Sequence, residues 1–241
     1  MQDALRIQSF GSAAHVLELA CVEFNGELRE NELRLKILAS PINPADLNWI
    51  SGTYGTTPML PAIPGGEAVA EVIESRHPNF GVGDRVMFWE HAHGWQEQRI
   101  VLGNQVRRLS ADIPILQAAM LRVNPGTAWQ MLHALGKLPK GTWIAQNAAN
   151  SGVGHCVIEI ATYLGLKTLN FVRRPSAIDD LHQLGADAVF LDDDDGLASA
   201  LTILGTDRAV LALNAVGGDS ATRLSLSLIH ISEPHETEAD L

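Results

Sequence analysis

Apolar and polar positions along the chain follow two patterns, one before and one after about residue 113. In the first part, short apolar runs alternate with segments rich in proline and glycine, at residues 33–38, 68–73, 85–89 and 98–102. Runs of this length, broken by turn-forming residues, are typical of strands in a barrel-like domain. We therefore predict a β-rich domain over residues 1–120.

The second part alternates strand-like and helix-like segments. Strand patterns occupy residues 142–146, 168–172, 188–191 and 209–213, and helix patterns occupy residues 127–135, 153–164, 177–184 and 197–204. This alternation predicts an α/β fold with a doubly wound parallel sheet over residues 121–225. The last strand leads into the turn from Asn214 to Gly218, at an edge of the sheet where ligands often bind.

The pattern stops after that turn. The stretch from Leu226 to Pro234 has neither a helix period nor the next strand, and it resembles the translation of a sequencing adaptor. We expect residues 226–241 to be a non-native tail and the parallel-sheet domain to be incomplete; a genuine terminal strand and tail is the alternative. We also expect the 241 residues by themselves to be poorly stable and weakly active or inactive.

The turn between the first strand and the first long helix of the second part has the features of a phosphate-binding turn. Residues 147–154 are small or polar except Val153, and from Val153 the helix has apolar residues at i, i+3, i+4, i+7, i+8 and i+11. A helix N-terminus approached by small residues binds pyrophosphate. The candidate cofactor residues are Asn150, Ser151, Gly152 and Val153. The stretch departs from G-x-G-x-x-G, so an ordinary tight turn remains the alternative.

The next predicted strand ends at two arginines, Arg173 and Arg174, and no carboxylate stands there. An acidic residue at this place binds the ribose hydroxyls of NAD, whereas arginine suits a 2′-phosphate. A guanidinium also binds phosphate with two hydrogen bonds. The pair predicts NADPH as cofactor; a solvated basic loop is the alternative.

Charge and composition exclude several classes of partner. The net charge of −11 argues against nucleic acid and anionic membranes, and no apolar run is long enough to cross a membrane. With no signal-peptide pattern at the N-terminus, we expect a cytoplasmic protein. We interpret the run from Asp192 to Asp195 as a solvated turn and Cys156 as a buried thiol on a helix face. Two cysteines, the other being Cys21, do not make a disulfide framework.

Several separate stretches carry a resemblance to a known family. The chain is similar to medium-chain dehydrogenases/reductases, and most similar to the 2-enoyl thioester reductases, the family of mitochondrial trans-2-enoyl-CoA reductase. The resemblance covers residues 1 to about 224 and implies a GroES-like barrel domain followed by a Rossmann domain. It rests on Pro41 to Asp46 with Gly52 to Tyr54, Pro64 to Glu67, Val123 to Ala128, Gln146 to Gly154, Val172 to Arg174 and Leu213 to Gly218.

The resemblance implies roles for individual residues. Tyr54 takes the place of the family's catalytic tyrosine, and Asn124 would contact the cofactor near the nicotinamide. The pyrophosphate would lie on residues 150–153 and the 2′-phosphate on Arg173 and Arg174. The family usually has Arg-Asp-Arg where this chain has Arg173, Arg174 and Pro175, which changes the phosphate clamp. Family members form homodimers through the cofactor domain, and an incomplete domain would lose that contact.

The resulting prediction is NADPH-dependent reduction of the C2–C3 double bond of an enoyl-CoA or enoyl-ACP thioester, with Tyr54 assisting proton delivery. Zinc enzymes of the superfamily carry an early cysteine and a Gly-His-Glu stretch; here Gly66 precedes Glu67, so no metal is expected. His91 and His93 are interpreted as loop histidines. The alternatives are a zinc-free quinone or alkenal reductase and a non-catalytic NADPH-binding protein.

Overall fold

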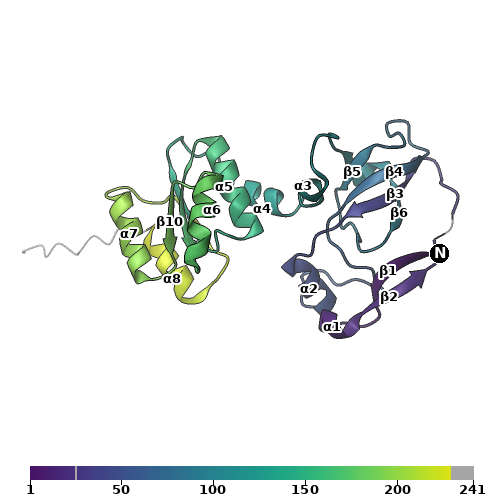
Figure 1. The fold of residues 1–241 in the computed structure, drawn as a ribbon, viewed down its shortest axis with the longest axis horizontal. Helices are drawn as coiled ribbons and strands as arrows, with labels where there is room; N and C mark the ends of the chain where they lie inside the picture. Colours follow the sequence, from purple (N-terminus) through teal and green to yellow (C-terminus); the bar gives the residue numbers. More distant parts are fainter. Residues whose placement is uncertain (25, 229–241) are drawn as a thin grey trace, which may run out of the picture. The chain divides into compact units, whose positions relative to one another are not determined.

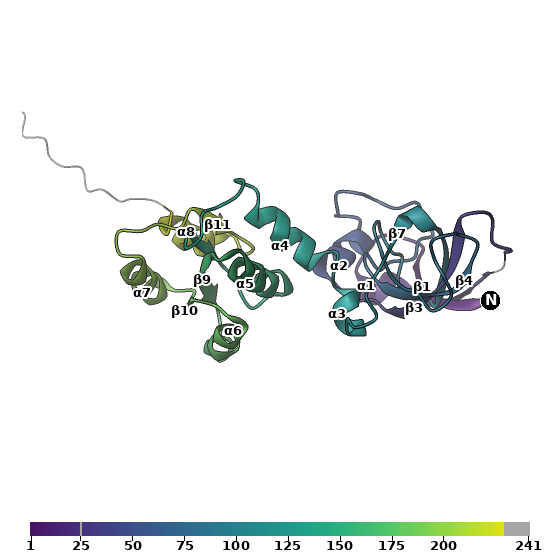
Figure 2. The same cartoon turned by 90° about the horizontal axis from the view of Figure 1, so that it is seen from above.

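The computed structural model describes residues 1–24 and 26–228. The chain divides into two compact units, the first spanning Met1–Val123 and the second beginning at Asn124. Each unit is built around its own sheet, as the ribbon in Figure 1 and the turned view in Figure 2 show.

The first unit contains a five-stranded antiparallel sheet with the order β6-β3-β4-β5-β7. Along β3 the buried residues Leu33 and Leu35 alternate with Arg34 and Lys36, as expected for a strand with one face on the core. The strands are β3 (Glu32–Ala39), β4 (Val69–Ser75), β5 (Arg85–Phe88), β6 (Gln98–Leu102) and β7 (Val106–Arg108). The four strands predicted in this part are therefore confirmed.

The remaining elements of the first unit were not predicted. Strands β1 (Gln2–Ile7) and β2 (Leu17–Val22) form an antiparallel pair, joined to the rest where Ile7 and Ala62 exchange two backbone hydrogen bonds. The short helices are α1 (Ala13–Val16), α2 (Pro44–Ser51), α3 (Ile115–Ala119) and the 3₁₀ turn η1 (Gly103–Gln105). These helices are only one to two turns long, so they are too short for a helical period to stand out in the sequence.

The second unit contains a four-stranded parallel sheet with the order β10-β9-β8-β11. The strands are β8 (Trp143–Gln146), β9 (Lys167–Val172), β10 (Ala188–Leu191) and β11 (Leu211–Leu213). Numbered within this unit, the order is 3-2-1-4, as in the first four strands of a dinucleotide-binding sheet. Ligands of such sheets bind at the carboxyl ends of the strands where the order reverses, here β8 and β11. The predicted α/β class is confirmed.

Helices cover both faces of this sheet (Figure 1). Ile144 of β8 packs with α4 and α5, whereas its neighbour Ala145 packs with α7 and α8. The half-buried Cys156 of α5 belongs to the first of these faces, so its predicted burial is partial. The helices are α4 (Asn124–Leu132), α5 (Gly152–Leu164), α6 (Ile178–Leu184), α7 (Asp194–Leu204), α8 (Gly218–Leu226) and the 3₁₀ turn η2 (Pro175–Ala177).

The structure differs from the sequence analysis at the aspartate run and at α8. Asp192 is not solvated: its side chain is 6% exposed and pairs with Arg223 of α8 at 3.0 Å. Asp193 caps α7, because its Oδ1 accepts the N–H of Gly196 at 2.8 Å. Helix α8 was not predicted, because its sequence is mostly polar and only Leu224 packs in the core.

The predicted tail begins at the last residue of α8. Ser227 is buried and its carbonyl accepts the N–H of Ala209, while residues 229–241 lie outside the described residues. Among the helices of the described part, none is long and apolar enough to span a membrane.

Candidate functional site

Tyr54 lies in the loop that follows α2, and this loop is held in place by the end of the helix. Gly52 ends the helix in the left-handed conformation, at a φ of 78°, which glycine adopts without strain. The backbone N–H of Tyr54 then donates to the carbonyl of Asn48 at 3.2 Å. The Tyr54 side chain is 48% exposed, so its phenol is accessible to a ligand.

Tyr54 lines a pocket of about 200 Å³ within the first unit, called here the Tyr54 pocket. Three of the sequence stretches quoted for the family resemblance meet in it, although they are far apart along the chain. The other lining residues are Asn43, Ala45, Asp46, Trp49, Gly66, His91, Arg122 and Val123.

Two buried carboxylates tie these stretches together. Asp46 accepts the backbone N–H of Asn43 on Oδ2 and that of Gly66 on Oδ1, both at 2.7 Å. Glu67 accepts the Asn43 amide at 2.9 Å on Oε1 and the backbone N–H of Val123 at 3.0 Å on Oε2. Each carboxylate oxygen thus has a neutral donor from the protein. These residues hold the pocket wall, a role that the sequence alone did not reveal.

His91 and Arg122 add polar groups to the pocket. The His91 ring stacks on Trp49 with ring centroids 4.9 Å apart. Burial, followed by the nearby His93, Arg122 and Arg99, lowers the pKa of His91 to about 4, so the ring is neutral at neutral pH. Arg122 donates from Nη2 to the Gly66 carbonyl at 2.7 Å, while its buried Nε has no acceptor among the described residues. His91 does lie in a loop, as predicted, but its place in the pocket was not foreseen.

The position where related zinc enzymes carry a histidine is Gly66, which has no side chain. A Cβ on Gly66 would lie 3.2 Å from Oδ1 of Asp46 and 4.0 Å from both Arg122 Nη2 and His91 Nε2. Across the described residues, no three histidines, cysteines or carboxylates gather as a metal site would require.

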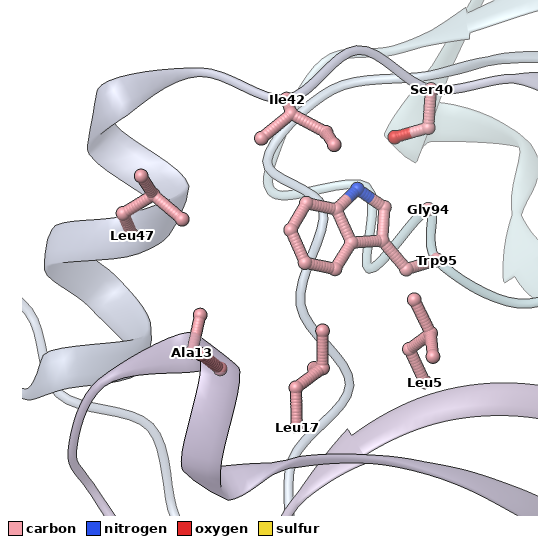
Figure 3. A pocket seen from close by; sticks show the side chains of 9 residues that line it. Leu5, Ala13, Leu17, Ser40, Ile42, Leu47, Gly94 and Trp95 are labelled. Carbon is pink, nitrogen blue, oxygen red and sulfur yellow. The ribbon is translucent and has the colours of Figure 1, made fainter.

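A second pocket of the first unit is apolar (Figure 3). It has a volume of about 550 Å³, and the ring of Trp95 lies among the aliphatic side chains that line it. Its lining residues are Leu5, Ala13, Ala14, Leu17, Ser40, Ile42, Leu47, Gly94 and Trp95. None of these residues is titratable, so this pocket offers apolar contact but no acid or base.

The candidate phosphate turn of the second unit joins β8 to α5. Ser151 caps the helix by accepting the N–H of Gly154 on its hydroxyl at 3.1 Å. Asn124, at the start of α4, reaches this turn: a Cβ on Gly152 would lie 2.6 Å from its amide nitrogen. The structure therefore brings Asn124 to the predicted residue Gly152, and Asn150, Ser151 and Val153 belong to the same turn.

A buried chain of hydrogen-bonded side chains lies beside the turn, and the sequence analysis did not predict it. Gln146, at the end of β8, donates to the carbonyl of Gly154 at 3.1 Å and to the Asn170 side chain at 2.8 Å. Asn170 in turn donates to the Thr168 hydroxyl at 2.9 Å. Buried polar groups that are all paired in this way hold one geometry. The chain fixes the first turn of α5 against the sheet.

Arg173 and Arg174 directly follow β9 and are exposed. The phosphate turn lies beside the end of that strand, because the N–H of Ala149 donates to the carbonyl of Phe171 at 3.2 Å. Within the described part of the chain, neither guanidinium has a hydrogen bond or an ion pair. Both are thus available to an anion at the strand end.

The turn after β11 is tied to the turn after β8. Asn147 donates to the Asn214 side chain at 2.8 Å and accepts the N–H of Ala215 at 2.7 Å. It also donates to the Ser220 hydroxyl at 2.9 Å, and Ser220 donates to Asp192 at the end of β10. One polar network therefore joins the carboxyl ends of three strands around the crevice expected to bind a ligand.

Comparison with known proteins agrees with this arrangement. Residues 29–106 match the family model of the alcohol dehydrogenase GroES-like domain. Over 229 residues the chain is 40% identical to the mitochondrial enoyl-[acyl-carrier-protein] reductase of Caenorhabditis elegans, covering 92% of the chain and 66% of that protein. The chain spans 66%, 64% and 59% of the length of three such relatives, from C. elegans, Xenopus tropicalis and Homo sapiens.

Solved structures give the same assignment. The chain is similar to the mitochondrial 2-enoyl thioester reductase Etr1p/Etr2p heterodimer from Candida tropicalis, at 28% identity and a TM-score of 0.84. It is also similar to a complex of Etr1p with NADP and crotonyl-CoA, at 28% identity and a TM-score of 0.86. Both alignments cover 94% of this chain and 72% of the solved chain. The chain belongs to the 2-enoyl thioester reductase family of the medium-chain dehydrogenases/reductases.

Proposed function

We propose that the protein reduces the C2–C3 double bond of trans-2-enoyl thioesters with NADPH. The observation that carries the proposal is the Tyr54 pocket, in which three separated stretches place an accessible phenol beside further hydrogen-bond donors. The likeness to Etr1p, solved with NADP and crotonyl-CoA, supports the same reaction. These relatives are longer than this chain.

The residues of the second unit fit NADPH. Gly152 and Gly154 let the turn pack closely against Asn124 and Ala149, and the start of α5 favours an anion. We assign the pyrophosphate to Asn150, Ser151, Gly152 and Val153. The nicotinamide end is assigned to Asn124. When bound, NADPH supplies the hydride for the β-carbon.

Arg173 and Arg174 are assigned to the 2′-phosphate. Their guanidiniums are exposed at the end of β9 and have no partner among the described residues, which suits a phosphate clamp. Pro175 directly follows and starts η2, so this chain clamps the phosphate with two adjacent arginines in place of the family's Arg-Asp-Arg.

Tyr54 is assigned the proton transfer. Reduction delivers hydride to C3 and a proton to C2, and a phenol hydroxyl can donate that proton. The residue lines the pocket with its side chain half exposed, so a thioester can reach it.

The finer points of partner and location are proposals too. We infer a CoA or acyl-carrier-protein thioester as substrate, since the curated relatives are named for the carrier protein and Etr1p was solved with crotonyl-CoA. Etr1p is named as part of a heterodimer, and we propose that this protein also associates, in a homodimer. The cytoplasmic location stays a prediction, whereas the relatives are named as mitochondrial.

The test replaces Tyr54 in this chain, or in a longer protein that contains it, with phenylalanine. NADPH oxidation with crotonyl-CoA should fall by about a hundredfold or more, the usual contribution of a positioned proton donor. Tyr163→Phe is the control, because Tyr163 is 82% exposed on α5, outside the pocket. Near-normal turnover by Tyr54→Phe would remove the catalytic assignment. NADPH oxidation with quinones but not with crotonyl-CoA would favour the quinone reductase alternative.

A further inference from the structure

The space above Gly66 in the Tyr54 pocket is flanked by two donors that the proposed function has not used. Arg122 Nη2 and His91 Nε2 each lie 4.0 Å from the point that a Cβ on Gly66 would occupy. That point is open because residue 66 has no side chain. Both groups come from loops separate from α2, and they lie in the same pocket as the Tyr54 phenol.

The hydrogen-bond pattern of His91 determines which nitrogen carries its proton. Its Nδ1 accepts the backbone N–H of His93 at 3.2 Å. A neutral imidazole has one N–H, so the proton is on Nε2, the atom that faces Gly66. Arg99 holds this loop by donating to the carbonyls of His91 and Ala92 at 2.8 and 2.6 Å. The Nε2–H donor is therefore fixed in place before any ligand binds.

Arg122 brings a positive charge that no carboxylate of the described residues pairs with. Its one assigned hydrogen bond goes to the neutral carbonyl of Gly66, at 2.7 Å. The nearby carboxylates of Asp46 and Glu67 are occupied by donors from their own loops. A guanidinium held next to an open space by one neutral acceptor has donors left for a ligand oxygen.

We propose that Arg122 and His91 form an oxyanion site over Gly66 that binds the thioester carbonyl oxygen of the substrate. This inference rests on the proposed function and extends it. As hydride adds to C3, the electron pair of the C2–C3 bond shifts to C1–C2 and the carbonyl pair moves to the oxygen, giving an enolate. The two donors hold that oxygen, and C2 then takes the proton from Tyr54.

The occupant is an oxygen that is neutral at first and becomes negative during reaction. A ligand with a full charge would also lie close to Asp46, whose Oδ1 is 3.2 Å from the Cβ position on Gly66. A thioester carbonyl avoids that repulsion in the bound state, and the charge of Arg122 matters most as the enolate forms. The positive charge of Arg122 must therefore offset the carboxylate of Asp46 as the enolate forms, and through it the site binds the transition state more tightly than the neutral substrate.

Acetoacetyl-CoA tests the site without hydride transfer. This 3-oxo thioester loses a C2 proton to solvent and becomes an enolate that absorbs in the near ultraviolet. Donors on its thioester oxygen increase the enolate fraction. The chain should raise the enolate absorbance of acetoacetyl-CoA above that of the free compound at the same pH. Arg122→Ala should lower the equilibrium constant for enolate formation by bound acetoacetyl-CoA by about a hundredfold, as for loss of one oxyanion donor.

Further variants separate this role from folding. His91→Phe keeps a ring on Trp49 but removes the Nε2 donor, and it should also weaken the enolate signal. His133→Phe is its matched control, because His133 stacks on Trp129 in the second unit with centroids 4.2 Å apart. Arg107→Ala, which removes an exposed arginine over Trp89, is the control for Arg122. Circular dichroism and NADPH affinity report whether each variant folds.

The oxyanion site is overturned if the unmodified chain gives no enolate signal. It is also overturned if the folded Arg122→Ala and His91→Phe variants each give a signal as strong as that of the unmodified chain. An enolate signal that depends on both residues, in a protein that does not reduce crotonyl-CoA, upholds the site and rejects the reductase proposal. If the protein reduces crotonyl-CoA but its enolate signal does not change in either variant, the reductase proposal is upheld and the oxyanion site is rejected.

Discussion

At the scale of single residues, the Tyr54 pocket uses charged and neutral groups for different purposes. Asp46 and Glu67 are buried and bonded on both oxygens by the protein, so they hold the wall. His91 is kept neutral by burial, which keeps its single donor on Nε2. Arg122 retains donors for a ligand oxygen. The groups left to bind a ligand in this pocket are therefore those whose hydrogen bonds the protein itself does not use.

The lowered pKa of His91 predicts a pH-dependent stability. The pKa of His91 is about 4 in the folded protein and 6.5 in the unfolded chain, so the unfolded chain takes up a proton first as the pH falls. The contribution of His91 to the stability of the folded protein is therefore complete above pH 6.5 and is lost as the pH falls toward about 4. We expect the midpoint of thermal unfolding to fall over this window, and His91→Phe to reduce the slope. Burial also lowers the pKa of His93, so part of the slope should remain. Equal slopes in both proteins would contradict the assigned burial of His91.

At the scale of elements, the cofactor turn depends on close approach of two backbone segments. A Cβ on Gly154 would lie 2.8 Å from Cα of Ala149 and closer still to its carbonyl oxygen. These atoms are backbone, so they have no rotamer by which to move away. Gln146 also holds this part of the turn, because its side chain donates to the carbonyl of Gly154.

We predict that Gly154→Ala destabilises the second unit by about 1–3 kcal/mol, the usual cost of overpacking, and weakens NADPH binding. Gly126→Ala in α4 is the control, because a Cβ there meets nothing within 4 Å; alanine should stabilise that helix by about 0.5–1 kcal/mol. Urea unfolding and NADPH titration measure both effects. A Gly154→Ala protein as stable as the Gly126→Ala protein would disprove the close approach.

The elements with a strong period were predictable, and the site only in part. The apolar spacing on α5 and the apolar runs of β3 and β9 identified these elements because each packs on a core. Helices α2 and α8 were missed, since one is short and the other mostly polar. Tyr54, Asn124 and Arg173 were named from motifs. His91 and Arg122 were not, because a pocket formed by distant loops leaves no spacing in the sequence.

At the scale of the whole molecule, two units carry separate parts of one proposed reaction. The first provides the Tyr54 pocket and the second a turn suited to NADPH. The assay that tests this reaction should detect even slow chemistry. Isotope transfer with protein in excess over thioester meets that need.

The most direct test follows deuterium into crotonyl-CoA from NADPH that carries deuterium at both C4 positions of the dihydronicotinamide. We predict butanoyl-CoA carrying one deuterium at C3, with much less product from equally labelled NADH, and loss of the product in Tyr54→Phe. Mass spectrometry of the thioester measures the transfer directly. Oxidation of the labelled NADPH without deuterium at C3 would contradict the account.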